Sequence, residues 1–211
     1  MFYTCVLRIN TGRTKHDYHI LENLHDIIEK CKRQDRHGQR VLYERYYAFA
    51  LKTVFRYTGN YEMAVDVAND TFIKVFNHIE EFNAEKAIHL EALLLGWLKK
   101  ILIRTAIDQL RMEKKHKGNV SLTEADADRI LAPENADHRV LYRELLLHLG
   151  SLSEGYRIVF NMNAIDGYGF NEIAEILNLP AGTVRSHFFR AKKILQQLIT
   201  QKPIQKTYVQ P

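Results

Sequence analysis

The sequence predicts an all-α fold, with two small helical domains joined by a flexible linker and a helix-turn-helix in the second domain. Three observations lead to this expectation. Apolar residues recur at spacings of three and four through most of the chain, and strand-like alternation is nowhere sustained. A polar stretch without periodicity separates two helical blocks, and 211 residues are enough for two small domains.

The helical signals divide the chain into five segments. The start of the chain matches no usable pattern, and the other end has the polar, proline-containing composition of a frayed terminus. The expected segments are an N-terminal extension at 1–17, a first helical domain at 18–112, a linker at 113–137, a second helical domain at 138–200 and a tail at 201–211.

The first domain is expected to begin with two helices. The first helix has Leu21, Leu24, Ile27, Ile28 and Cys31 on one face, and a second helix runs toward Gly59. The pair Gly59-Asn60 ends this helix and starts the next, because glycine tolerates the left-handed conformation and asparagine caps a helix start.

The third helix, about 61–82, separates into two faces at about 100° per residue. The face expected in the core contains Ala64, Ala68, Phe72, Val75, Ile79 and Phe82. The opposite face contains Asp66, Asn69, Asp70, Ile73 and Asn77. On spacing alone, the second face is a solvated surface with one stray aliphatic residue.

The fourth helix, roughly 92–112, combines an apolar stripe with a basic face. The inward stripe is Leu94, Trp97, Leu98, Ile101 and Thr105. The outward cations are Lys99, Lys100, Arg104 and Arg111, which solvent or a ligand can reach. Trp97 is expected to belong to the core because it lies on the inward stripe.

The second domain contains a short helix at 170–177, a tight turn at 178–180 and a longer helix that starts after Pro180. The outward residues of the longer helix are Arg185, Ser186, Phe189, Arg190 and Lys193. This arrangement is typical of a helix-turn-helix, whose second helix enters the major groove of DNA. The alternative is a solvated helix end, where cations complement the helix dipole.

The bulk composition agrees with a polyanionic partner without proving one. The formal net charge is +5. Cys5 and Cys31 are too few for a zinc site or a disulfide framework, so no metal or cofactor is expected and a reducing cytoplasm fits. No apolar run approaches the roughly 18 residues of a membrane span.

Four stretches in order resemble the extracytoplasmic-function (ECF) sigma factors, the small sigma-70-type subunits of bacterial RNA polymerase. The resemblance covers about residues 18–112 and 138–198. The matching stretches are Asp66-Val-Ala-Asn-Asp-Thr-Phe-Ile-Lys-Val-Phe76, Gly96 to Arg111, Leu152 to Tyr168, and Glu172 to Lys192.

The resemblance implies a function in transcription initiation, with core RNA polymerase and promoter DNA as partners and no enzymatic activity. An anti-sigma factor is a further partner to test, because one is common in this family. The polymerase-facing residues implied are Asp66, Asn69, Asp70 and Ile73. Those implied for the −10 element are Lys99, Lys100 and Arg104. Those implied for the −35 element are Thr183, Arg185, Ser186, Phe189, Arg190 and Lys193.

The chain departs from the family pattern in three places. Ile103 and Arg104 stand where a basic residue and asparagine are frequent, and the stretch 83–95 is longer than the usual loop. No residue of that stretch is therefore assigned to the −10 base pocket. Gly169 replaces a serine or threonine cap, although Glu172 is placed to complete a capping box.

Two other function classes fit parts of the sequence. A helix-turn-helix regulator acting independently of core polymerase would explain the second domain but not the Asp66 face or the fourth helix. An enzyme would need a partner for one of the scattered histidines, His78, His89, His116, His138 and His148, and none is found at a convincing spacing.

Overall fold

The computed structural model describes residues 23–83, 88–114, 123–131 and 136–201, and within these ranges it contains helices and no strand. Four helices and one short turn form the first unit, here called the N-terminal bundle. Its elements are α2 (Leu24–Lys32), α3 (Arg36–Thr58), α4 (Tyr61–His78), the 3₁₀ turn η2 (Ile79–Glu81) and α5 (Leu90–Lys114).

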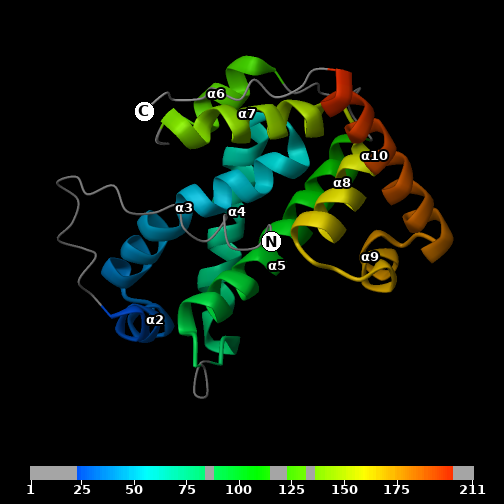
Figure 1. The fold of residues 1–211 in the computed structure, drawn as a ribbon. Helices are drawn as coiled ribbons and strands as arrows, with labels where there is room; N and C mark the ends of the chain where they lie inside the picture. Colours follow the sequence, from blue (N-terminus) through cyan, green and yellow to red (C-terminus); the bar gives the residue numbers. More distant parts are fainter. Residues whose placement is uncertain (1–22, 84–87, 115–122, 132–135, 202–211) are drawn as a thin grey trace.

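The second unit, here called the C-terminal unit, follows a short helix, α6 (Glu124–Leu131). Its elements are α7 (Ala136–Gly150), α8 (Glu154–Phe160), the π-helical turn η3 (Asn161–Ile165), α9 (Phe170–Leu177) and α10 (Ala181–Gln201). Figure 1 shows α2 and α10 on opposite sides of the molecule, with α6 and α7 together at one end. The all-α fold predicted from the sequence is confirmed for the described residues.

Local capping explains where the helices of the bundle begin and end. The side chain of Asn23 accepts a hydrogen bond from the His25 amide, and that of Asn60 accepts one from the Met63 amide at 2.8 Å. Such caps are worth about 1 kcal/mol each. Gly59 ends α3 in the left-handed conformation, with φ of 66°, as the Gly59-Asn60 pair predicted.

The core of the bundle is built from the predicted stripes. The six inward residues of the third predicted helix are all buried, from Ala64 to Phe82. Helix α4 itself ends at His78, and η2 continues the chain to Phe82. Leu94 and Leu98 are buried on α5 as predicted, whereas Trp97 is half-buried, with its ring 5.3 Å from that of Phe82.

Helix α6 lies inside the segment expected to be an irregular linker. Its Ala127, Ile130 and Leu131 are buried. On its exposed side Arg129 pairs with Glu62 of α4 at 2.7 Å and lies 3.7 Å from the ring centroid of Tyr61. Three apolar residues form too short a stripe to be recognised within a polar stretch, so this helix was not expected.

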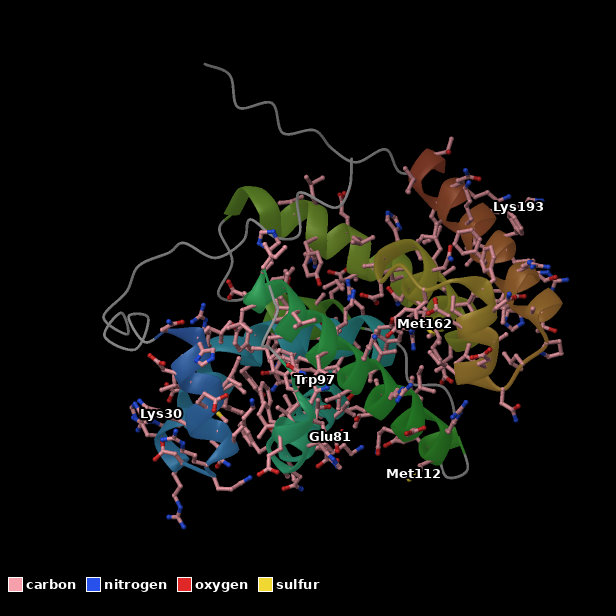
Figure 2. All side chains as sticks on the ribbon, turned by 90° about the horizontal axis from the view of Figure 1, so that it is seen from below. Lys30, Glu81, Trp97, Met112, Met162 and Lys193 are labelled. Carbon is pink, nitrogen blue, oxygen red and sulfur yellow. The ribbon has the colours of Figure 1, made fainter. Side chains whose placement is uncertain are left out.

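The C-terminal unit has a small core of its own. It consists of Leu149, Leu152, Ala191 and Leu195. Six other buried residues of the unit belong to the same apolar cluster as the bundle: Leu146, Ile158, Val159, Met162, Ile173 and Val184. Met162 lies at the junction of the two units (Figure 2). The two units therefore pack directly on each other.

Among the described helices, none combines the length and the apolar character that crossing a bilayer requires.

Candidate polymerase and nucleic-acid interfaces

The polar face of α4 is exposed, as the helical wheel predicted. Asp66 and Asp70 are exposed, and Ile73 has 59% of its surface accessible. These positions lie one turn apart along the same side of the helix, so two carboxylates stand beside one exposed aliphatic side chain. A single exposed aliphatic side chain is ordinary on a protein surface, so the exposure of Ile73 alone assigns no partner to this face.

Asn69 is the best fixed residue of this face. It is half-buried, and its amide oxygen accepts a hydrogen bond from the Tyr43 hydroxyl of α3 at 3.0 Å. The Tyr43 ring is itself held by Phe72, with ring centroids 4.8 Å apart. The core aromatic residues therefore determine how the Asn69 amide is presented.

The predicted cations of α5 are in two different environments. Lys100 and Arg104 are exposed. Lys99 is half-buried, and its ammonium donates to the Asp166 main-chain carbonyl at 3.3 Å and lies 3.5 Å from that residue's carboxylate. The structure thus brings Lys99 into contact with the C-terminal unit, while the other two cations face solvent.

The helix-turn-helix forms where it was predicted. Helix α9 covers the predicted residues 170–177, and Asn178 turns the chain in the left-handed conformation with φ of 52°. The Glu172 carboxylate accepts a hydrogen bond from the Gly169 amide at 2.7 Å, as the capping box predicted. The glycine cap is thereby supplemented by the glutamate of the first turn.

The basic face of α10 points away from the core. Arg185, Ser186, Phe189, Arg190 and Lys193 are exposed, and Thr183 is half-buried. Phe189 has 61% of its surface accessible, whereas the adjacent Phe188 packs on Phe160 and Phe170. Figure 2 shows Lys193 on the outer side of α10. The outward position predicted for Arg185, Ser186, Phe189, Arg190 and Lys193 is therefore confirmed.

One contact orients a predicted DNA-binding side chain. Arg190 donates to the hydroxyl of Tyr156 on α8 at 3.2 Å. Tyr156 also packs edge-on against the His187 ring, with centroids 5.0 Å apart. Burial lowers the pKa of His187, and the charge of Arg190 acts in the same direction. The neutral imidazole therefore adds no repulsion to the arginine.

Comparison with known proteins assigns both helical units. The family described as Sigma-70 region 2 matches residues 42–116, and Sigma-70, region 4 matches residues 142–195. The ECF RNA polymerase sigma-E factor of Haemophilus influenzae is 26% identical over 183 residues, which cover 82% of this chain and 93% of that protein. The chain is an ECF sigma factor of the sigma-70 family.

Further relatives of this sigma factor have a similarly low sequence identity. The RNA polymerase sigma-H factor of Pseudomonas aeruginosa is 26% identical over 183 residues, which cover 82% of this chain and 92% of that protein. The solved structure of CnrH in complex with the cytosolic domain of CnrY aligns with a TM-score of 0.44 at 18% identity. That alignment covers 84% of this chain and 97% of the CnrH chain.

A buried polar cluster joins the two units of the sigma factor. The Arg56 guanidinium at the end of α3 lies 3.2 Å from the Asp166 carboxylate, and the Tyr57 hydroxyl donates to the same carboxylate at 2.6 Å. The side chains of Arg56 and Asp166 are only 9% and 3% exposed. Such a pair lies in an environment where leaving either charge unpaired is costly.

Electrostatics keep the Arg56 and Tyr57 side chains of the cluster protonated at neutral pH. Burial is the largest single influence and lowers the pKa of Arg56, but the charge of Asp166, the neighbouring Tyr142 and Tyr57 and the hydrogen bond to Asp166 together outweigh it, so the pKa of the guanidinium is raised. Burial, followed by the negative charge of Asp166, raises the pKa of Tyr57 well above its usual value. The phenol therefore stays protonated and remains a hydrogen-bond donor.

Sequence reasoning missed this cluster. Arg56 follows the buried residues Thr53, Val54 and Phe55, and a cation inside an apolar run is the available signal that a partner exists. The identity of the partner was hidden, because Asp166 is 110 residues away along the chain. Within the part of the chain that the structure describes, no group of acidic, histidine or cysteine side chains is suited to a metal ion.

Proposed function

We propose that this sigma factor binds core RNA polymerase through α4 and directs initiation at promoters whose −10 and −35 elements are contacted by α5 and α10. One observation supports the assignment. The two regions that match the sigma-70 family present three separate faces, two on region 2 and one on region 4. Region 2 presents the acidic face of α4 and the cations of α5, and region 4 presents the basic face of α10.

The α4 face is suited to polymerase binding by its mixture of charge and apolar surface. Asp66 and Asp70 steer the helix toward a basic surface, and Ile73 supplies the apolar contact. Asn69 contributes a hydrogen-bonding group whose orientation is already fixed by Tyr43. A fixed side chain loses little entropy on binding.

The α10 face is suited to reading the −35 element. An arginine donates two hydrogen bonds to guanine in the major groove, and an apolar side chain contacts the thymine methyl group. The exposed face of α10 supplies both kinds of base contact through Arg185, Arg190 and Phe189, and its Lys193 can bind a backbone phosphate group. Thr183 and Ser186 add hydroxyl groups near the start of the same helix.

The α5 face is suited to the −10 element through its positive charge. Lys99, Lys100 and Arg104 are proposed to hold phosphates while single-stranded bases are captured. The half-buried Trp97 is assigned a packing role against Phe82. No catalytic role is proposed for any residue, and the cytoplasm is the proposed location.

The deciding experiment is run-off transcription from a promoter library by core polymerase, with and without the protein. Transcripts that appear only when the protein is present support the proposal and define the promoter sequence. Absence of such transcripts, together with tight promoter binding by the protein alone, would instead indicate a regulator that acts without polymerase.

Single substitutions are expected to distinguish the proposed DNA-binding face of α10 from the proposed polymerase-binding face of α4. Arg190→Ala is expected to weaken use of the −35 element by about 1–3 kcal/mol, as for one lost base contact, while polymerase binding is retained. Ile73→Ala is expected to weaken polymerase binding instead. Arg40→Ala, at an exposed arginine of α3, is the matched control. Equal loss of both activities in Arg190→Ala contradicts the assignment.

A further inference from the structure

One cation of the basic face of α10 differs from its neighbours because another helix holds it. The Nη1 group of Arg190 donates a hydrogen bond to the Tyr156 hydroxyl of α8 at 3.2 Å. Within the described part of the chain, the Arg185 and Lys193 side chains of the same face make no such bond. Long side chains without a partner move among several rotamers, whereas a hydrogen bond to a fixed group restricts them. Arg190 is therefore the cation of this face whose direction is set before DNA arrives.

Tyr156 is itself fixed by the packing of α8 alongside α10 (Figure 1). Its ring is half-buried, contacts the small core of the C-terminal unit and packs edge-on against His187, with centroids 5.0 Å apart. One turn farther along α8, the Phe160 ring stacks on that of Phe188, with centroids 5.9 Å apart and ring planes 14° apart. Two successive turns of α8 thus pack on two adjacent residues of α10, so a shift of the phenol along α10 would break both aromatic pairs.

His187 supports the phenol and does not compete with it for the arginine. It lies three residues before Arg190, on the same side of α10. Burial, followed by the charge of Arg190, lowers the pKa of His187, so its ring is neutral at neutral pH. The buried Nδ1 atom of His187 has no hydrogen-bond partner among the described residues. Its contact with Tyr156 is therefore one of packing, and the hydroxyl is the group that binds the guanidinium.

The hydroxyl leaves the guanidinium of Arg190 able to read a base. A guanidinium carries its N–H donors in a rigid planar fork, and the hydrogen bond to Tyr156 occupies only one of them. Guanine in the major groove accepts two hydrogen bonds from such a fork, at O6 and N7. Attachment through Nη1 keeps the Nη2 donors free for the base and sets the plane in which the fork approaches it.

We propose that Tyr156 is a positioning residue for the −35 contact, whose hydroxyl holds the Arg190 guanidinium from outside the helix-turn-helix and so sharpens the preference for one base pair. This inference rests on the proposed function, which assigns Arg190 to the −35 element. A side chain that is already fixed loses less conformational freedom on binding. The freedom saved for one long side chain corresponds to about 2- to 10-fold in affinity.

The first test measures the order of Arg190 in the full chain without DNA or polymerase. Nuclear magnetic resonance relaxation of the arginine Nε–H groups reports how restricted each guanidinium is. In the wild type, the order parameter of Arg190 is expected to exceed that of Arg185, and in Tyr156→Phe it should fall to the Arg185 value. Equal order parameters for the two arginines in the wild type, or no change in Tyr156→Phe, overturn the proposal.

The second test is run-off transcription by core polymerase and the full chain from a library with all four bases at each −35 position. Arg190→Ala identifies the position that this arginine reads, because the base preference there is lost. Tyr156→Phe is expected to reduce the preference at that position by about 2- to 10-fold and to leave the other positions unchanged. The salt dependence of promoter binding should stay constant, because no phosphate contact is removed. An undiminished preference, or an equal loss at every position, overturns the proposal.

Two controls separate positioning from stability. Tyr61→Phe removes a hydroxyl from α4, keeps the ring beneath Arg129 and should retain every base preference. In an Arg190→Ala background, Tyr156→Phe should not change promoter affinity, and a further loss there would assign Tyr156 a structural role and overturn the proposal.

The two tests also separate this inference from the proposed function. The comparison of Arg190 with Arg185 in the wild type needs no variant, so it decides the matter even if Tyr156→Phe does not fold. If Tyr156→Phe frees Arg190 while Arg190→Ala removes no base preference, the contact stands and the proposed −35 role of Arg190 fails.

Discussion

The N-terminal bundle and the C-terminal unit are both helical, but they are stabilised differently. The bundle encloses large, fully buried side chains such as Phe55, Phe72 and Leu102. The C-terminal unit encloses four residues of its own and places Val159 and Met162 in the core of the bundle. Region 2 can therefore supply its own stability, whereas region 4 obtains part of its stability by docking on region 2.

The polar contacts of the two units show the same contrast. In the bundle, caps such as that of Asn60 join groups three residues apart. At the junction, Arg56, Arg157 and Asn161 form bonds between residues about a hundred positions apart. Local contacts survive separation of the units, while the contacts at the junction are lost together.

The largest expected effect is in the core of the bundle. Phe72→Ala should lower the free energy of unfolding by about 3–5 kcal/mol, because it leaves a cavity where a side chain is 2% exposed. Urea denaturation followed by circular dichroism measures this. Phe189→Ala, at an exposed phenylalanine, should change it by less than about 0.5 kcal/mol. Similar losses in both variants would show that the buried position of Phe72 contributes no more to stability than the exposed position of Phe189.

An effect of intermediate size is expected at the junction. Arg56→Met should cost about 3 kcal/mol, because the buried Asp166 carboxylate loses its main partner. Adding Asp166→Asn should restore part of the loss, with a coupling energy of about 0.5–3 kcal/mol in a double-mutant cycle. Strictly additive losses would show that the two side chains do not interact in solution.

The smallest of the three effects is expected in the C-terminal unit. Leu195→Ala should cost about 2 kcal/mol, the lower end for such a change, because this core is small and close to solvent. Hydrogen exchange should show faster exchange for α10 amides, with α4 unaffected. The exposed neighbour Gln196→Ala is the control. Equal acceleration in α4 would mean that the two units unfold as one.

The helices of both units were largely predictable, because each carries a long apolar stripe. The apolar stripe from Ala64 to Phe82 predicted the buried face of α4 and of the short turn η2 after it, and the pattern of 170–177 predicted α9. Helix α6 was not predicted, because its buried apolar stripe consists only of Ala127, Ile130 and Leu131. The positions of the domain boundaries and the roles of the site residues stay predictions.

The proposed surface residues were predictable as exposed side chains, but their neighbours were not. Periodicity places Lys99 on the outer face of its helix, and the structure places Asp166 against it. Helical periodicity describes one element at a time, so it cannot report which distant element covers a face. The buried cluster of Arg56, Tyr57 and Asp166 depends entirely on that tertiary information.

The π-helical turn η3 determines the rotation of the chain between two of the groups that meet α3. The Asp166 amide bonds to the Asn161 carbonyl, five residues back, at 2.9 Å. In a regular α-helix, residues five apart point about 140° away from each other. The wider turn adds one residue to the helical circuit and brings both side chains to the same neighbour. Removal of a single residue from η3 would rotate Asp166 away from Arg56 with every side chain of the cluster still present, so the register of the backbone is as necessary to this contact as the chemistry of its residues.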